Sequence, residues 1–365
     1  MPDHSSIQAL HPASSQSQPG SEADLGALAG NSRIIWGIIA AMAVVAILGY
    51  WSAGLSFAWM SGYATLVGVV ILLTVSCFYR RFRPDPTIIF GTESCAQLAL
   101  VLSLGCALSY PLAVAGFPYC DAALNAVDTW MGLDWRSLLR FVNDRPLLSA
   151  LSGLAYRSIL FQFSILVLSL VITSQPLRLQ QYVQASALAL AITLAIFAFA
   201  PAGGTYAFLH IEPNEFSHLS PVTTAQQLVH IDALRSGQHT HVTGMEGLIT
   251  FPSFHAVWAI LFMWGFYPIK QLRYGAIMLN LSVLASTPIQ GAHYFIDLIG
   301  GTAVATIAIY GATRLLRDLS AGVAPKKRTY ACQNNMPTEP VLAAVFSVSH
   351  VISTQMVEID PAGTD

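Results

Sequence analysis

Charged residues are scarce in this chain. Asp, Glu, Lys and Arg make up only 10% of its 365 residues, whereas a soluble domain carries about 25%. Hydrophobic residues make up 54%. This balance argues against a soluble globular protein and predicts an integral membrane protein. The net charge of −2 provides no excess of cations for a polyanion, so we expect no nucleic-acid partner.

Cysteine is also scarce, and its five positions do not form a metal-ligand pattern. Three of the cysteines lie in or beside apolar runs, one lies in a loop and one lies near the C-terminus: Cys77, Cys95, Cys106, Cys120 and Cys332. The spacing does not indicate a disulfide framework. We therefore expect neither a metal nor another cofactor. The first residues also lack the basic segment that begins a secretory signal peptide.

Eight apolar runs are each near the length that spans a bilayer, which is about 20 residues. They cover residues 34–51, 58–79, 95–116, 158–172, 183–200, 251–267, 274–287 and 292–315. This pattern predicts an all-α, polytopic membrane bundle with about eight transmembrane helices. We expect four parts: a disordered tail (1–32), two added transmembrane helices (33–94), a six-helix catalytic core (95–317) and a mostly disordered cytoplasmic tail (318–365). Within the last part, residues 341–352 are apolar enough for a short surface helix.

Lys and Arg residues beside the apolar runs indicate the orientation of the chain, because such residues favour cytoplasmic loops. Eight crossings with both termini in the cytoplasm place all of the following inside: Arg80, Arg81, Arg83, Arg178, Lys270, Arg273, Arg314, Arg317, Lys326, Lys327 and Arg328. The same topology places the start of run 251–267 and the start of run 292–315 together at the outer face.

Two polar islands lie at those two starts, residues 251–255 (FPSFH) and 291–297 (GAHYFID). If the chain is helical from residue 292, His293 and Asp297 lie on one face, one turn apart. Asp297 could then hold one ring nitrogen of His293 and leave the other free to attack an electrophile. His255 could protonate a leaving oxygen. The alternative is that each histidine only forms structural hydrogen bonds, although ionisable groups in membrane segments are costly and usually functional.

The two islands carry a family resemblance. Residues 252–255 resemble the P-S-x-H motif of the type 2 phosphatidic acid phosphatase superfamily, and residues 286–297 resemble its S-R-x-x-x-x-x-H-x-x-x-D motif. The resemblance implies that His293 is a nucleophile that forms a phosphohistidine and that Asp297 orients it. It also implies that His255 is the general acid and that Ser253 binds phosphate.

The chain departs from the superfamily pattern at its cationic positions. Thr287 stands where the second motif has Arg, and no K-x-x-x-x-x-x-R-P motif precedes residue 251. The sequence around both islands resembles that of the branch that contains inositol phosphorylceramide synthases. This similarity indicates a headgroup transferase as an alternative to a phosphatase.

The long polar loop, residues 201–250, has one Lys or Arg, and this is Arg235. We expect Arg235 to bind phosphate, with a solvated loop arginine as the alternative, and Gln290 to donate its amide to a phosphate or headgroup or to cap a helix. Gly203-Gly204 could offer backbone N–H groups to an anion, although a helix-ending turn is the simpler interpretation. His239-x-His241 lacks further ligands for a metal, so we favour polar loop surface there.

These observations predict a multi-pass, metal-independent membrane phosphatase or phosphotransferase. Its substrate would be a membrane lipid phosphate, a polyprenyl diphosphate or a phospholipid headgroup. The active site would face the periplasm or a lumen, and water or an alcohol would accept the phosphoryl group. The alternative is a non-catalytic lipid transporter or scaffold on the same fold, in which the histidines relay protons or bind substrate.

Overall fold

The computed structural model describes residues 22–322, apart from 213–214, 220, 223–225, 239 and 243–246. The helices within this part are α1 (Glu22–Ala53), α2 (Trp59–Phe82), α3 (Pro86–Val114), α4 (Asp121–Trp130), α5 (Trp135–Asn143), α6 (Pro146–Arg157), α7 (Ile159–Ile172), α8 (Pro176–Phe199), α9 (Thr205–Phe208), α10 (Gln226–Arg235), α11 (Phe254–Phe266), α12 (Arg273–Gln290) and α13 (Phe295–Gly322). Two short parallel strands, β1 (Ser56–Phe57) and β2 (His241–Val242), pair beside them. The predicted all-α polytopic bundle is confirmed.

Five of the described helices are long and apolar enough to cross a membrane: α1, α2, α3, α8 and α13. Helices α6 and α7 form a sixth candidate as one pair, bent by 46° at the break between them. The predicted runs at 251–267 and 274–287 are helical as α11 and α12, but α11 has only 13 residues. The segment before residue 158, which contains both charged and apolar residues, folds as the short helices α4, α5 and α6.

The predicted N-terminal tail is wrong over residues 22–32, because α1 begins at Glu22. Asn31 and Ser32 are buried in this part of α1. The Asn31 amide donates to the backbone carbonyl of Gln180, and the Ser32 hydroxyl donates to Glu93. These partners are distant in sequence, so composition alone could not reveal them. Helix α13 likewise continues to Gly322. The rest of both predicted tails, with the predicted surface helix at 341–352, lies outside the described residues.

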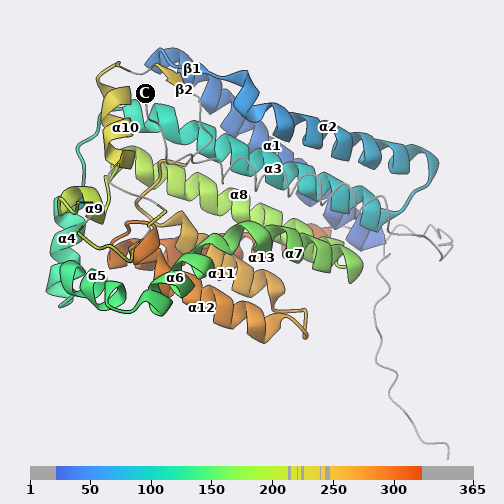
Figure 1. Ribbon diagram of the computed structural model, residues 1–365. Helices are drawn as coiled ribbons and strands as arrows, with labels where there is room; N and C mark the ends of the chain where they lie inside the picture. Colours follow the sequence, from blue (N-terminus) through green and yellow to red (C-terminus); the bar gives the residue numbers. More distant parts are fainter. Residues whose placement is uncertain are drawn as a thin grey trace, which may run out of the picture.

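Different helices and helix ends lie at the two ends of the bundle. Helices α3 and α8 run through its middle, and α4, α5, α9 and α10 gather at one end (Figure 1). The starts of α11 and α13 and the end of α12 lie at that same end. At the other end, the start of α1 lies beside the end of α13, where a Cβ on Gly30 would be 3.1 Å from Leu319. Both polar islands therefore lie at the opposite end of the bundle from these two helix ends.

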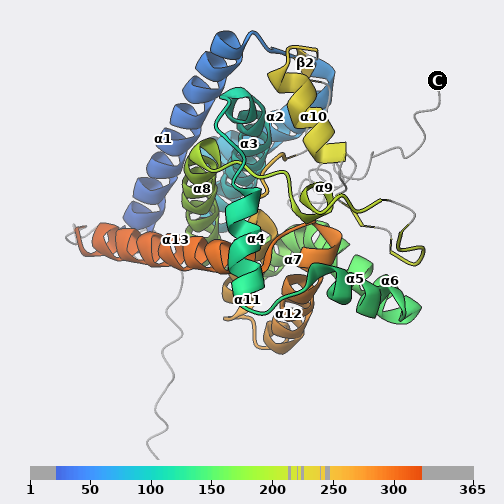
Figure 2. The same ribbon diagram turned by 90° about the vertical axis from the view of Figure 1, so that its left-hand side faces the viewer.

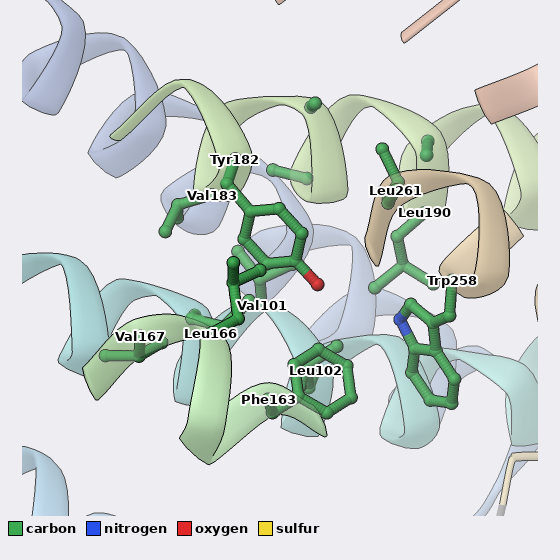
Figure 3. Close-up of a cluster of buried hydrophobic side chains, with 14 of the residues drawn as sticks. Val101, Leu102, Phe163, Leu166, Val167, Tyr182, Val183, Leu190, Trp258 and Leu261 are labelled. Carbon is green, nitrogen blue, oxygen red and sulfur yellow. The ribbon is translucent and has the colours of Figure 1, made fainter. Parts of the chain in front are cut away.

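The apolar core joins α3, α7, α8 and α11 (Figure 3). The labelled side chains are Val101, Leu102, Phe163, Leu166, Val167, Tyr182, Val183, Leu190, Trp258 and Leu261, and each is buried. In a membrane, close van der Waals packing of this kind holds helices together. The core fixes α11 against α8, and so fixes the position of the first polar island at the start of α11.

Candidate active site

His293 and Asp297 form a buried pair at the start of α13. His293 Nδ1 lies 3.2 Å from Asp297 Oδ2, and the same oxygen accepts a hydrogen bond from the backbone N–H of Tyr294 at 3.0 Å. The side chain of Asp297 is 0% exposed. The expectation that the helix includes residue 292 is wrong, because α13 begins at Phe295 and Ala292 has a φ of +55°. Asp297 reaches His293 by folding back over the first turn of the helix.

The two polar islands touch through their backbones. The Ser253 N–H donates to the Asp297 carbonyl at 3.1 Å. A Cβ on Gly301 would lie 2.3 Å from the Ser253 carbonyl oxygen, so only glycine permits this approach of α13 to the start of α11. Ser253 is fully buried and is the N-cap of α11, where its hydroxyl oxygen accepts from the Ala256 N–H at 3.3 Å.

His255, on the first turn of α11, faces a residue that sequence reasoning missed. Tyr156 Oη, on α6, lies 3.2 Å from His255 Nδ1. The two rings stack with their centroids 4.3 Å apart and an angle of 16° between their planes. The ring centroids of His255 and His293 are 6.2 Å apart. The structure therefore brings both predicted histidines and Asp297 together in one site.

Gly291 and Gln290 connect this site to α6. A Cβ on Gly291 would lie 2.7 Å from Tyr156 Oη and 2.8 Å from His293 Cδ2, so the chain runs close between these two side chains. Gln290 is buried, and its amide nitrogen donates to the Ser152 hydroxyl at 2.9 Å. Its amide oxygen has no hydrogen-bond partner within the described part of the chain. Gln290 thus joins α12 to α6 and leaves one acceptor unused.

Arg157 brings a positive charge to the same part of α6. Its Nη1 atom and the Gln290 side-chain amide both lie within 4 Å of the position that a Cβ of Gly153 would occupy. The side chain of Arg157 is exposed. Sequence reasoning missed this residue because it lies 98 positions before His255, at the end of a segment without a recognisable motif.

Asp121, on α4, forms hydrogen bonds with Tyr294 of the second island and with the turn at Gly203-Gly204. Its carboxylate accepts from the backbone N–H groups of Gly203 and Gly204, at 2.8 and 2.9 Å, and from the Tyr294 hydroxyl at 2.9 Å. The idea that Gly203-Gly204 binds a substrate anion is therefore wrong, because the side chain of Asp121 already occupies these donors. Asp121 is buried, so this carboxylate stabilises the turn and orients Tyr294 beside His293.

Asp128 lies two turns further along α4 and caps α13. Its carboxylate oxygens accept from the backbone N–H groups of Phe295 and Ile296, at 2.8 and 3.1 Å, and from Trp135 Nε1 at 3.1 Å. A carboxylate at a helix N-terminus satisfies unpaired N–H groups and interacts favourably with the helix dipole. Asp128 therefore fixes the turn of α13 from which Asp297 reaches His293.

Arg235 does not join the histidines. Its Nε donates to the carbonyl of Ala113, at the end of α3, at 2.7 Å, and its guanidinium lies 4.2 Å from the centre of the Tyr119 ring. Both views place its helix, α10, away from α11 and α12 (Figures 1 and 2). Arg235, the last residue of α10, therefore contacts the end of α3, whereas His255 lies on α11 and His293 just before α13.

No group of three or more His, Cys, Asp or Glu side chains suited to a metal was found within the described residues. His241 lies in β2, where its Nδ1 is 2.8 Å from the Ser56 hydroxyl. His239 lies outside the described residues.

One of three comparisons with known proteins found a match. A family model described as the PAP2 superfamily matches residues 122–311, which include α5 to α12, most of α4 and of α13, and both polar islands. Neither the comparison with curated proteins nor the comparison with solved structures found a match. The family match spans just over half of the chain and confirms the resemblance seen in the two motifs at the level of the superfamily. The chain belongs to the PAP2 superfamily, the type 2 phosphatidic acid phosphatases and their relatives.

Proposed function

We propose that this protein is a metal-independent membrane enzyme that transfers a phosphoryl group from a lipid phosphate or diphosphate through a phosphohistidine on His293. The observation that carries the proposal is the arrangement of the two histidines. Their ring centroids are 6.2 Å apart, and each presents its Nδ1 atom to a different partner. The Nε2 atom of each ring is therefore left to react: in our proposal that of His293 attacks phosphorus, and that of His255 protonates the leaving oxygen.

In the first step, the Nε2 lone pair of His293 forms a bond to phosphorus, and the bond from phosphorus to the leaving oxygen breaks. His255 gives its Nε2 proton to that oxygen, so the lipid leaves as a neutral alcohol or a protonated phosphate. Asp297 faces Nδ1 of His293 at 3.2 Å and stabilises the positive charge that the ring gains. In the second step, water or an alcohol attacks phosphorus, its proton passes to His255, and the bond to His293 breaks.

Charge also spreads onto the phosphoryl oxygens and needs donors. We assign this role to Arg157, in place of the predicted Arg235, because Arg157 is the cation whose position is tied to Gln290 and to the helix of Tyr156. Ser253 and Gln290 would complete the set, since each is buried at the site and has a hydroxyl or amide group. The contacts of Arg235 with α3 support a structural role for that residue.

The surroundings of Arg157 favour a lipid substrate. Its helix, α6, exposes a row of leucines, Leu147, Leu151 and Leu154, which are 73%, 53% and 69% exposed. These apolar side chains would face lipid tails while the cation meets the headgroup. We place the site at the outer leaflet, with both termini cytoplasmic, from the distribution of Lys and Arg. The similarity to the inositol phosphorylceramide synthase branch favours an alcohol as acceptor.

Trapping of the intermediate tests the proposal. The purified full-length protein is mixed with radiolabelled phosphatidic acid or polyprenyl diphosphate and quenched in base, because phosphohistidine survives alkali. We expect protein-bound label that is lost in His293→Ala and kept in the control His241→Ala, whose exposed histidine lies in β2. Label that persists in His293→Ala would exclude His293 as the nucleophile. Absence of label from every donor would favour the transporter or scaffold alternative.

A further inference from the structure

The two histidines of the site differ in the group that holds them. His293 Nδ1 faces the carboxylate of Asp297, whereas His255 Nδ1 faces the hydroxyl of Tyr156. A carboxylate can only accept a hydrogen bond and carries a full negative charge. A phenol both donates and accepts, and it is neutral near pH 7. The two rings are therefore placed in different electrostatic surroundings although both belong to one site.

The hydroxyl of Tyr156 is held in place by close packing. The Tyr156 and His255 rings lie almost parallel, with their centroids 4.3 Å apart. Trp258 meets the His255 ring with a centroid distance of 5.6 Å and an interplanar angle of 74°. Gly291 lies against the Tyr156 hydroxyl, which a Cβ there would approach to 2.7 Å. Tyr156 is 4% exposed, so its hydroxyl has little freedom to leave His255.

We propose that Tyr156 is a positioning residue that holds His255 by Nδ1 while Nε2 delivers a proton to the leaving oxygen. This inference rests on the proposed function and deepens it. When His255 is protonated, its Nδ1–H donates to the Tyr156 oxygen. After Nε2 has given its proton away, Nδ1 keeps its own proton and continues to donate to the Tyr156 oxygen. The same contact thus holds the ring in both charge states, and the proton returns to Nε2 from the incoming water or alcohol.

The different Nδ1 partners of His293 and His255 account for the different roles that we propose for the two histidines. His293 must stay positively charged while it carries the phosphoryl group, and the adjacent Asp297 carboxylate favours that charge. His255 must lose its charge within the same step. A neutral phenol orients the ring without adding a negative charge that would oppose the loss of the proton. The contacts at Nδ1 therefore assign the nucleophile and the acid without reference to a sequence motif.

The test compares two substrates that differ in their need for an acid. Phosphatidic acid releases an alkoxide that needs a proton, whereas p-nitrophenyl phosphate releases a stable phenolate. On phosphatidic acid we expect kcat to fall about tenfold or more in Tyr156→Phe and roughly 10²–10⁴-fold in His255→Gln. On p-nitrophenyl phosphate we expect kcat of Tyr156→Phe to stay within about threefold of the wild type, because proton transfer contributes little there.

Three further variants make the result specific. Tyr182→Phe removes a buried hydroxyl from the apolar core (Figure 3) and should change neither rate. The double variant Tyr156→Phe/His255→Gln should be no slower than His255→Gln alone, because both changes disable one function. His293→Ala should be inactive on both substrates.

The outcomes separate the inference from the proposed function. A Tyr156→Phe enzyme that matches the wild type on phosphatidic acid would overturn the positioning role, and so would an equal loss on both substrates. Activity of His293→Ala on either substrate would instead overturn the proposed function. If Tyr156→Phe fails to fold, 3-fluorotyrosine placed at position 156 keeps the ring and changes only the acidity of the hydroxyl. An unchanged ratio of the two substrate rates in that protein would overturn the inference.

Discussion

Replacement of Gly291 by alanine is predicted to damage catalysis more than it damages the fold. The new methyl group would lie 2.7 Å from Tyr156 Oη, 2.8 Å from His293 Cδ2 and 3.0 Å from the Thr287 carbonyl oxygen. The backbone itself accepts alanine, because Gly291 has a φ of −105°. The strain of the substitution is therefore steric, and two of the three atoms that it displaces belong to side chains of the site.

The size of the effect follows from these distances. Ordinary van der Waals contacts of a Cβ begin at 3.4 Å, so each of the two side chains must move by roughly 0.6–0.7 Å. A displacement of about 1 Å in an active site costs about 10²-fold in rate, so we expect kcat to fall by at least about tenfold. Overpacking of this kind lowers the free energy of unfolding by about 1–3 kcal/mol.

The assay measures phosphate release from phosphatidic acid together with the thermal unfolding of the purified protein in detergent. Gly275→Ala is the matched control, since it lies on the same helix, α12, and a Cβ there meets nothing within 4 Å. The control should keep its activity and gain about 0.5–1 kcal/mol of stability from the better helix former. Full activity in Gly291→Ala would refute the placement of Tyr156 and His293 on either side of this glycine.

Three further predictions concern the surroundings of the site. Asp121→Ala leaves three buried donors unpaired and should lower the free energy of unfolding by roughly 3 kcal/mol or more. Asp134→Ala removes only an exposed helix N-cap and should cause a clearly smaller loss. Thermal or denaturant unfolding measures both losses. Arg157→Gln should lower kcat/KM for phosphatidic acid by at least about tenfold, whereas Arg235→Gln should lower stability and keep kcat/KM; the reverse pattern would restore Arg235 as the phosphate ligand. Burial, with the charges of Asp121 and Asp297, raises the pKa of the Cys120 thiol from 9.0 to about 11. The thiolate fraction near pH 7.5 should then be about a hundredfold lower, and maleimide labelling correspondingly slower than for a free thiol in solution. Labelling at the rate of a free thiol would contradict the partly buried position of Cys120 beside Asp121.

Much of the fold could be predicted from local features of the sequence. Apolar runs, their lengths and the Lys and Arg residues beside them report how each segment meets a bilayer, whatever its neighbours are. The same features predicted that the islands at 251–255 and 291–297 lie together at one face. In the structure the two islands are joined by a hydrogen bond from the Ser253 N–H to the Asp297 carbonyl. The pairing of His293 with Asp297 is likewise a local property, because four positions separate the two residues.

Other parts of the site depend on contacts between distant segments. Tyr156 lies 99 positions from His255, and Asp121 lies 173 positions from Tyr294. Neither residue has a motif, because a single tyrosine or aspartate acquires its role only from what the helix packing places beside it. The same reason explains why the sequence could not place Arg235, since its charge was visible in the sequence but its contacts with Ala113 and Tyr119 were not.

The sequence by itself determined that the protein is a membrane bundle and which residues could react, because hydrophobicity and residue chemistry are properties of the chain. Only the tertiary structure decided which groups hold those residues: Tyr156 against His255, and Asp128 at the start of α13. Helix packing sets these distances, and hydrogen bonds require an accuracy of a few tenths of an ångström that no spacing along the chain supplies.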